Sequence, residues 1–421
     1  MHVVVIGCGL AGVTTAYYLH RLGAEVTVVD REPGPARGAS HANGSLLTPS
    51  LADPWNSPGV FRRLIGSIGR EDSAMLLRPS ELPKLSRWGV SFLRNSKWRY
   101  FSESYLHNVH LSLYSRHLLH QLMDELAIDF EHSSTGVLKI FQVESELAKS
   151  VKVAHWLKQA GITHRVLDPD SLVSLEPALE PVKEILAGAL KFDCDEVGNA
   201  YLFCVKLKEH LAESGVRFRF SEQVRSLRIT RNRIQAVATA REDLVADSFV
   251  LAAGCYSPGL VGNMRCSIPV APAKGYSLTL RSGGRDASPV LPRHAIVDDS
   301  LHAVVSPLGP DKLRIAGTAE FAGFDTQVRS ERIENLLNLF KRIFPEIPID
   351  QSRIQSWAGL RPMTPDGRPI LGPTPYENFF LNTGHGALGW TMACASGKTV
   401  AEIVVGEPPD YDVSPFVLDR F

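Results

Sequence analysis

The sequence has few cysteines and no net charge. Its six cysteines among 421 residues are scattered, with no CxxC pair and no cysteine–histidine cluster. This spacing argues against a zinc site and a disulfide framework, and it favours a reducing compartment. Lysine plus arginine equals aspartate plus glutamate, at 45 each, so the whole chain does not attract nucleic acid. We therefore expect no metal site and no nucleic-acid partner.

Long apolar runs are also absent. No stretch reaches the ~18 consecutive apolar residues of a membrane-spanning helix. The apolar N-terminus lacks the basic residues of a signal peptide, and its glycines are needed by the first predicted strand and helix. With 44% apolar and 21% charged residues, the chain has the composition of a globular protein of two or three domains. We expect a cytoplasmic location.

Residues 3–30 predict a strand, a glycine turn, a helix and a second strand. Val3 to Ile6 is an unbroken β-branched run, which is typical of a parallel strand buried on both faces. Glycines follow at GxGxxG spacing, at positions 7, 9 and 12, and apolar residues then recur at helical period. The second strand ends in Asp30.

This unit has the residues that a dinucleotide requires. Gly7 permits the tight turn, Gly9 lets the backbone approach a pyrophosphate, and Gly12 lets helix and strand pack closely. The helix N-terminus offers free N–H groups and a partial positive charge to the phosphates. Asp30 lies where a carboxylate can accept hydrogen bonds from both ribose hydroxyls. The pattern therefore predicts a dinucleotide site.

Two later segments have alternative interpretations. Residues 31–59 are rich in Gly, Pro, Ser and Asn, and they form either a functional loop with Ser40 and Asn43 against a ligand or a surface linker. Residues 60–101 carry nine basic residues against three acids, with Leu82, Leu85, Trp88 and Phe92 on one helical face. That face lies either on a membrane surface or against the core of the domain itself.

The middle of the chain interrupts the strand–helix–strand pattern. Residues 107–196 predict a mixed α+β insertion, and the pattern returns at Gly198. A buried strand at 248–253 then runs into Gly254, where backbone can approach a cofactor at the carboxyl edge of the sheet. Strands dominate again from 266 to 356, with one helix over 331–344.

The C-terminal third holds a second group of candidate residues. Arg361 lies between Gly359 and Pro362, a rigid setting that suits a bidentate clamp on a carboxylate; the alternative is a surface ion pair. Residues 382–397, NTGHGALGWTMACASG, form a glycine turn that enters an apolar helix. The N-terminus of that helix can face the N1–C2=O edge of a flavin and stabilise the negative charge of the reduced ring.

Taken together, these motifs resemble one flavoenzyme family. The chain resembles the small-subunit type of bacterial D-amino-acid dehydrogenase, within the D-amino-acid oxidase, glycine oxidase and sarcosine oxidase superfamily. The resemblance covers nearly the whole chain and rests on VVVIGCGLAGV, VTVVDREPG, SHAN, KGYSLTL, GLRPMTPDG and NTGHGALGWTMACASG. One departure is the sequence after Asn43, where Gly44, Ser45 and Leu46 replace the usual Ala, Gly and Gln; another is His41, in place of a small residue.

The resemblance implies an α/β fold with FAD as cofactor. A Rossmann-like FAD-binding domain is expected from the discontinuous segments 1–60, 197–265 and 356–421. Segments 61–196 and 266–355 are expected to form a mixed α+β substrate domain with an antiparallel sheet. The resemblance also implies the site residues. Arg361 is expected to hold the substrate carboxylate, and Tyr276 and His385 to form the pocket wall. The expected FAD contacts are Gly7, Gly9, Leu10, Ala11, Gly12, Asp30, Arg31, Ser40, Asn43, Gly44, Val224, Gly254, Gly386, Gly389, Trp390 and Thr391.

The implied reaction is oxidative deamination of a D-amino acid to a 2-oxo acid and ammonia. Hydride passes from Cα to flavin N5, and a quinone-type acceptor takes the electrons, with a peripheral position on the cytoplasmic face of the inner membrane through residues 60–101. Such a transfer needs orientation rather than a strong base. The alternatives are a D-hydroxyproline or cyclic imino acid dehydrogenase, a glycine- or sarcosine-type oxidase that uses oxygen, and a flavin-binding protein without turnover.

Overall fold

The first sheet is built on the N-terminal β-branched run. The computed structural model describes residues 1–71, 73–262, 264–281, 291–298 and 303–421. Its six-stranded sheet has the order β19-β20-β13-β1-β2-β9, and all pairs are parallel except β19 with β20. The strands are β1 (His2–Ile6), β2 (Glu25–Val29), β9 (Arg217–Arg219), β13 (Ser248–Leu251), β19 (Ile370–Pro373) and β20 (Phe379–Thr383).

The register of this sheet brings three chain segments to one edge. Ile6 lies opposite Val29 on one side and opposite Leu251 on the other, so β1, β2 and β13 end level with one another. Gly7, Asp30 and Ala252 follow these strands directly. Because ligands of open α/β sheets bind outside the carboxyl ends of the strands, this edge is where a nucleotide is expected.

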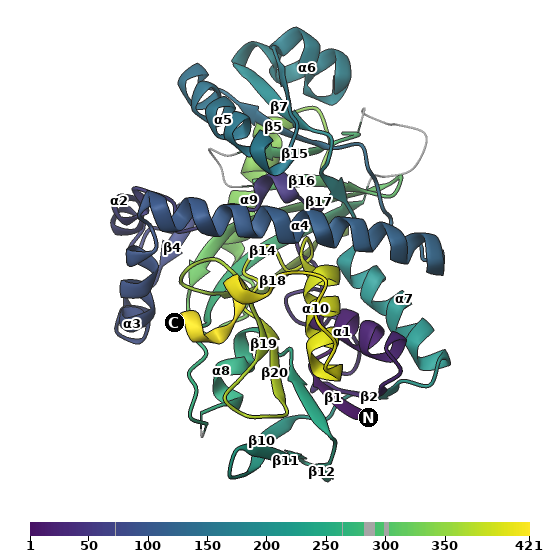
Figure 1. Ribbon diagram of the computed structural model, residues 1–421. Coiled ribbons are helices and arrows are strands. Elements are labelled where there is room, and N and C mark those ends of the chain that lie inside the picture. Colours follow the sequence, from purple (N-terminus) through teal and green to yellow (C-terminus); the bar gives the residue numbers. More distant parts are fainter. Residues whose placement is uncertain (72, 263, 282–290, 299–302) are drawn as a thin grey trace.

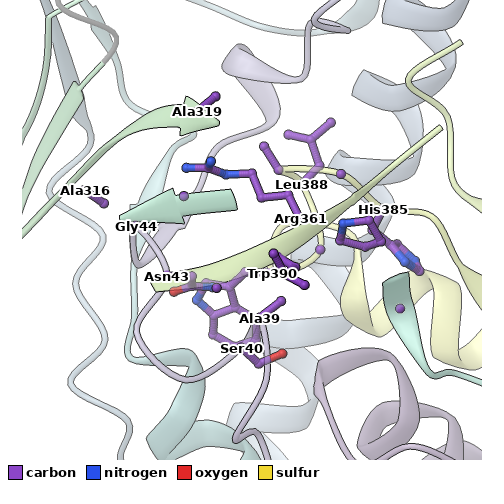
Figure 2. Close-up of a pocket in the computed structure, with 18 of the residues that line it drawn as sticks. Ala39, Ser40, Asn43, Gly44, Ala316, Ala319, Arg361, His385, Leu388 and Trp390 are labelled. Atoms are coloured by element: carbon purple, nitrogen blue, oxygen red, sulfur yellow. The ribbon is translucent and has the colours of Figure 1, made fainter. Parts of the chain in front are cut away.

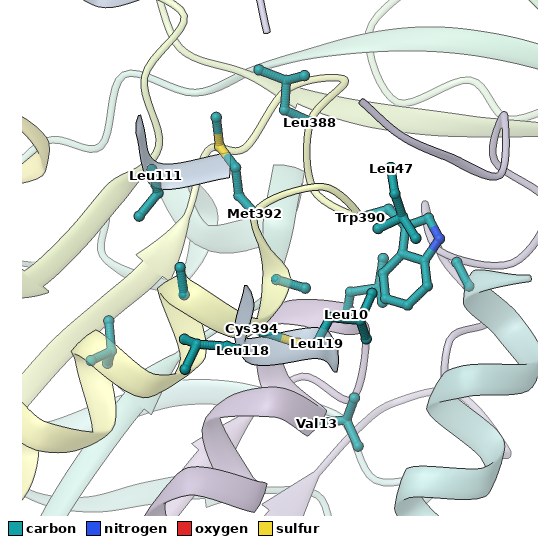
Figure 3. Packing of buried hydrophobic residues seen from close by; sticks show 14 of the residues in the cluster. Leu10, Val13, Leu47, Leu111, Leu118, Leu119, Leu388, Trp390, Met392 and Cys394 are labelled. Carbon is teal, nitrogen blue, oxygen red and sulfur yellow. The ribbon is translucent and has the colours of Figure 1, made fainter. Parts of the chain in front are cut away.

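Two helices from opposite ends of the chain pack tightly over this sheet. They are α1 (Leu10–Arg21) and α10 (Ala393–Val405). A Cβ atom at Gly397 would lie 2.6 Å from Thr14 Oγ1, and that hydroxyl donates a hydrogen bond to the Ala393 carbonyl at 2.9 Å. Figure 3 shows the apolar side chains of this interface, among them Leu10, Val13 and Cys394. The glycine therefore sets how closely the two helices approach.

The second sheet contains nine strands and is mostly antiparallel. Its order is β18-β14-β17-β16-β15-β5-β7-β6, with β4 paired to β17; only the β15–β5 and β4–β17 pairs are parallel. The strands are β4 (Met75–Leu77), β5 (Val137–Phe141), β6 (Arg165–Leu167), β7 (Gly188–Phe192), β14 (Ala271–Arg281), β15 (Ala295–Asp298), β16 (Ala303–Leu308), β17 (Lys312–Phe321) and β18 (Gln355–Met363). The expected boundary at residue 356 thus falls inside β18, a strand of this second sheet.

The remaining elements connect and cover the two sheets. Smaller sheets comprise β10 (Val224–Thr230), β11 (Arg233–Thr239) and β12 (Asp243–Leu244), and β3 (Leu46–Leu47) with β8 (Glu196–Val197). The other helices are α2 (Val60–Gly66), α3 (Leu82–Arg94), α4 (Trp98–Leu126), α5 (Glu144–Leu157), α6 (Pro169–Leu175), α7 (Ala200–Glu213), α8 (Ser257–Leu260) and α9 (Ser330–Ile343). The long helix α4 runs across the molecule, between the α5–α6 part and the α1–α10 part (Figure 1). The expected α/β fold with a second, antiparallel sheet is confirmed.

The predicted amphipathic face of residues 60–101 lies against the core. On α3, Phe92 is buried, and Leu85 and Trp88 pack on the cluster around Phe321. The Trp88 indole N–H also donates to the Met363 carbonyl at 3.1 Å. A membrane-facing role for this stripe is therefore wrong, although Leu82 remains exposed. In the described part of the chain, no helix combines the length and apolar character needed to cross a membrane.

Candidate active site and cofactor cavity

A large cavity lies where the two sheets meet. Its volume is about 1730 Å³, above the roughly 300–1000 Å³ of most ligand pockets. The lining comes from the turn after β1, the loop at 37–57, the strands β14, β17 and β18, and the loop at 382–391. In the long glycine- and serine-rich loop that was predicted to lie against a ligand, Ser40, Asn43 and Gly44 all line the cavity. A dinucleotide-sized ligand fits this space.

The first glycine turn shapes one end of the cavity. Gly7 has φ +109°, and a Cβ there would lie 2.5 Å from the Ala252 carbonyl oxygen. Gly7 and Gly9 line the cavity, whereas Gly12 does not. A Cβ at Gly12 would lie 1.9 Å from the Gly7 carbonyl oxygen. Gly12 therefore holds helix α1 against the turn, and the other two glycines line the cavity.

The N-terminus of α1 opens into the same end. Leu10 and Ala11 line the cavity, and the first turn of the helix contains no acidic residue that would neutralise its positive end. Ser40 approaches from the long loop, and its Oγ accepts a hydrogen bond from the Leu10 N–H at 3.2 Å. The helix end therefore offers N–H donors and a partial positive charge to a pyrophosphate.

Asp30 and its neighbours form the end suited to adenosine. The Asp30 carboxylate accepts hydrogen bonds from the N–H groups of Cys8 at 2.6 Å and Glu32 at 2.9 Å. Burial raises its pKa from 3.8, while these two donors act in the opposite direction. The Arg31 guanidinium lies 3.7 Å from the centre of the Tyr256 ring. Val224 and Gly254 complete this wall.

The loop before α10 forms the opposite wall. Gly386, Gly389, Trp390 and Thr391 all line the cavity. Two of them are held by partners elsewhere in the chain: Gly386 N–H donates to the Pro362 carbonyl at 2.9 Å, and the Trp390 indole N–H donates to the Gly198 carbonyl at 2.9 Å. The Gly198 N–H in turn donates to the Ser45 carbonyl at 2.8 Å, so Trp390 is linked through Gly198 to the loop that carries Ser40 and Asn43 (Figure 2). This wall therefore brings the predicted flavin-side residues of two distant segments together.

Arg361 lines the cavity from the second sheet. It lies on β18, and its Nη1 donates to the Thr318 carbonyl at 3.0 Å. The guanidinium lies 5.3 Å from the centre of the Trp55 ring. Burial lowers its pKa to about 10, so it stays protonated at neutral pH. Among the described residues no carboxylate pairs with it, so the expected alternative of a surface ion pair is not what forms here.

Small residues surround the guanidinium. Gly275 of β14 lies directly beside it, and Ala316 and Ala319 of β17 line the cavity nearby (Figure 2). Because these side chains are short, the cavity beside the half-buried guanidinium has room for a small molecule that carries an anionic group. This arrangement suits a bidentate clamp on a carboxylate.

Tyr276 and His385 line the cavity, and a polar atom of each is already hydrogen-bonded to another side chain. The Tyr276 hydroxyl donates to Glu320 Oε2 at 2.5 Å, and its pKa is raised by burial and by this carboxylate. His385 Nε2 lies 2.9 Å from Ser396 Oγ, and burial lowers its pKa to about 4. His385 is therefore neutral at neutral pH. Both residues lie in the wall of the cavity, and their contact with a substrate stays a prediction.

Some cavity residues were not expected from the sequence. Tyr256, Trp357 and Gly275 line the cavity. An isolated glycine within a predicted strand is a known sign of close approach, so Gly275 could have been found. The unusual His41 does not line the cavity itself. Its ring packs on Tyr201, with centroids 4.8 Å apart, and lies 6.3 Å from Trp357, through which it can influence the pocket.

One potential metal-ligand group lies outside the cavity. His120, His132 and Glu196 place their ligand atoms within 4.8 Å of one another, a proximity that the sequence spacing did not indicate. Both histidines already bond the buried Glu196 carboxylate, at 2.8 and 2.7 Å, and Arg116 Nε donates to it at 2.5 Å. The guanidinium neutralises this carboxylate, so the group is best described as an ion-pair cluster joining α4 to β8.

The chain is similar to known flavoproteins over its full length. The family model described as FAD dependent oxidoreductase matches residues 2–403. A protein of Paramagnetospirillum magneticum named D-amino acid dehydrogenase is 39% identical over 422 residues, covering 100% of this chain and 99% of the relative. One of the same name from Granulibacter bethesdensis is 36% identical over 421 residues, covering 100% of both chains. The glycine oxidase of Geobacillus kaustophilus has the same fold, with a TM-score of 0.79, 22% identity and coverage of 100% and 98%.

Proposed function

Because the chain belongs to the FAD dependent oxidoreductase family, we propose that it oxidises D-amino acids as a dehydrogenase. The full-length relatives named D-amino acid dehydrogenase support this substrate class. The observation that carries the proposal is Arg361, a protonated, half-buried guanidinium that no carboxylate of the described residues pairs with, above a floor of small residues. An amino acid supplies the missing carboxylate.

The cavity fits FAD at both ends. The Gly7–Gly9 turn and the N-terminus of α1 suit the pyrophosphate, and Asp30 suits the ribose. Residues 386–391 and Asn43 suit the flavin ring. Bound FAD supplies a two-electron acceptor for the hydride that leaves Cα.

The protein's contribution to the reaction is orientation. Arg361 fixes the carboxylate, so the Cα–H has one direction relative to the wall at 385–391. Tyr276 keeps its proton and His385 stays neutral, so neither acts as a strong base. The substrate amine enters neutral after losing a proton to water, and the imino acid product hydrolyses to a 2-oxo acid and ammonia. The preference for one enantiomer follows from the face of the substrate that Arg361 turns toward the flavin.

An anaerobic flavin-bleaching panel tests the proposal. Purified holoenzyme is mixed under argon with D-alanine, D-proline, D-phenylalanine, glycine and the matching L-amino acids, and the visible flavin absorbance is followed. We expect bleaching with D-amino acids and none with the L-forms. Preference for D-proline over D-alanine would favour the cyclic imino acid alternative. A failure of every compound would favour a flavin-binding protein without turnover.

The identity of the acceptor separates a dehydrogenase from an oxidase. We propose that a membrane quinone takes the electrons rather than oxygen. The test compares turnover of D-alanine with a quinone and with air, while hydrogen peroxide is measured. Peroxide release at the rate of turnover would identify an oxidase instead.

Residues 60–101 support a peripheral membrane contact, through side chains other than the buried stripe of α3. Phe61, Ile65, Val90 and Trp98 are 54–70% exposed. Exposed basic side chains accompany them in the same segment: Arg62, Lys84, Arg87, Arg94, Lys97 and Arg99. Such a surface attracts anionic lipid. Co-sedimentation with anionic vesicles at low salt tests it, and the triple variant Phe61→Ser, Ile65→Ser, Val90→Ser should stay in the supernatant.

A further inference from the structure

The cavity continues beyond the site described above. Next to Ser50 it extends between α4 and α5, where aromatic and aliphatic side chains predominate in its lining. The first turns of α4 contribute three aromatic residues and the second half of α5 contributes the opposite wall. We define this α4–α5 branch by Trp98, Phe101, Tyr105, Val153, Trp156 and Leu157.

The aromatic rings of the branch form a continuous series from the surface inward. Trp98 is 57% exposed, and its ring centroid lies 6.0 Å from that of Trp156. Trp156 in turn lies 5.6 Å from Tyr105, which is only 4% exposed. The branch therefore opens at the N-terminus of α4 and becomes buried along its length.

Two hydrogen bonds tie the inner end of the branch to the cofactor wall. The Tyr105 hydroxyl donates to the Ser50 carbonyl at 2.9 Å. Two residues earlier, the Thr48 N–H donates to Thr391 Oγ1 at 3.1 Å, and Thr391 belongs to the wall before α10. All four residues line the same cavity. A molecule in the branch therefore reaches the neighbourhood of that wall without leaving the protein.

We propose that the α4–α5 branch binds the quinone that accepts the electrons. A quinone has a flat apolar ring, two carbonyl acceptors and an apolar tail, which suits stacking on tryptophan and tyrosine. A zwitterionic amino acid would lose its hydration against the six side chains that define the branch, none of which is charged. Lys139 and Asp298 also line the cavity, from the strands β5 and β15.

This inference rests on the proposed function, which supplies the electrons. Oxidation of the amino acid to the imino acid releases two electrons and two protons. The quinone takes up both and leaves as the quinol, so the overall exchange is balanced. The mouth of the branch at Trp98 lies in the segment that carries the exposed apolar and basic side chains, so a quinone can enter from a lipid surface.

Equilibrium binding of decylubiquinone to the oxidised holoenzyme tests the inference without turnover. Val153→Glu puts a charge on a 40% exposed branch residue, and Trp98→Ala removes the outer ring. Both residues are exposed, although the Trp98 ring also lies 5.9 Å from that of the buried Phe101. Val143→Glu is the matched control, because Val143 is 48% exposed next to α5 and does not line the cavity. We expect Kd to rise roughly tenfold in the two branch variants, the equivalent of ~1.4 kcal/mol, and to stay at the wild-type value in the control.

The KM for D-alanine with a water-soluble dye as acceptor distinguishes the possible failures. If decylubiquinone binds equally well to all variants while the dye-linked reaction proceeds, the branch is not the quinone site and the proposed function stands. If the variants raise the KM for D-phenylalanine instead of the quinone Kd, the branch is the substrate entrance and the inference is overturned. If no D-amino acid is oxidised, the proposed function fails, and a branch-dependent quinone Kd still supports the site.

Discussion

Gly275 and Arg361 lie side by side on neighbouring strands, and only the absence of a side chain at 275 leaves room for the guanidinium. A Cβ built on Gly275 would lie 2.3 Å from Arg361 Nη1 and 2.4 Å from Cζ. The two strands pair in register here, with Gly275 opposite Gly359 and Ala273 opposite Arg361. Gly275 therefore acts as a positioning residue for the proposed carboxylate clamp.

Gly275→Ala should displace Arg361 while the fold survives, because the far end of a flexible side chain can move away at little cost. We expect the KM for D-alanine to rise about tenfold, because a displaced guanidinium loses ~1.4 kcal/mol of binding free energy with the substrate carboxylate. The FAD content should not change. Steady-state kinetics with a dye acceptor measures this. Gly89→Ala is the control, since a Cβ at Gly89 meets nothing within 4 Å. A wild-type KM in Gly275→Ala would contradict the positioning role.

Removing the guanidinium should have a larger effect than displacing it. In Arg361→Ala we expect the KM for D-alanine to rise about a hundredfold, since charged hydrogen bonds each contribute roughly 1.5–3 kcal/mol. Arg361→Lys keeps the positive charge but loses the planar guanidinium. Its KM for D-alanine should lie between those of Arg361→Ala and the wild type. Flavin absorbance checks that FAD remains bound. An unchanged KM in Arg361→Ala would refute the assignment.

Asp30 should control cofactor retention rather than substrate affinity. Asp30→Asn keeps one carbonyl oxygen for the Glu32 N–H, but its amide nitrogen cannot accept the hydrogen bond from Cys8 N–H. It also loses the charge that would hold a ribose. We expect FAD to dissociate more readily on dialysis, with a Kd increase of about tenfold. The KM for D-alanine of the FAD-saturated variant should match the wild type, and a rise there would argue for a different role.

The buried His385 should make the fold sensitive to mild acid. Its folded pKa is lowered by burial from 6.5 to about 4. Below pH 6.5 the unfolded chain takes up a proton that the folded protein does not bind, so stability present above that pH is lost as pH falls toward 4. In His385→Gln this part of the loss should vanish. Thermal melts from pH 4 to 8 measure the difference in stability between the wild type and His385→Gln at each pH. His117→Gln is the control, because His117 is exposed. Parallel curves for wild type and His385→Gln would exclude this contribution.

The parts of the fold predictable from sequence are those governed by local pattern. Val3 to Ile6, the glycine turn and Asp30 lie within one continuous segment, so their periodicity was enough to place them in the unit that the structure contains. The helix over Glu331–Phe344 was found within one residue of the observed α9 at either end. In each case the residues that determine the element are its own neighbours in the chain.

The features that sequence reasoning missed depend on distant partners. Arg361 was expected in a rigid Gly/Pro-flanked setting, yet it lies on β18, because β14 supplies the hydrogen bonds that extend that segment. The stripe of α3 was compatible with lipid or core, and Phe321 and Met363, far along the chain, decide for the core. His120, His132 and Glu196 likewise meet only after α4 has crossed the molecule. The periodicity of a sequence reports on local neighbours and does not reveal contacts between distant segments.

The strand order of the first sheet has a consequence for biosynthesis. β1 emerges first from the ribosome, but its partner β13 and the strands β20 and β19 beyond it come from residues 248–251, 379–383 and 370–373. The wall at 386–391 follows later still. A nascent chain therefore cannot enclose its prosthetic group during most of translation, and flavin loading becomes a late event that depends on nearly complete synthesis.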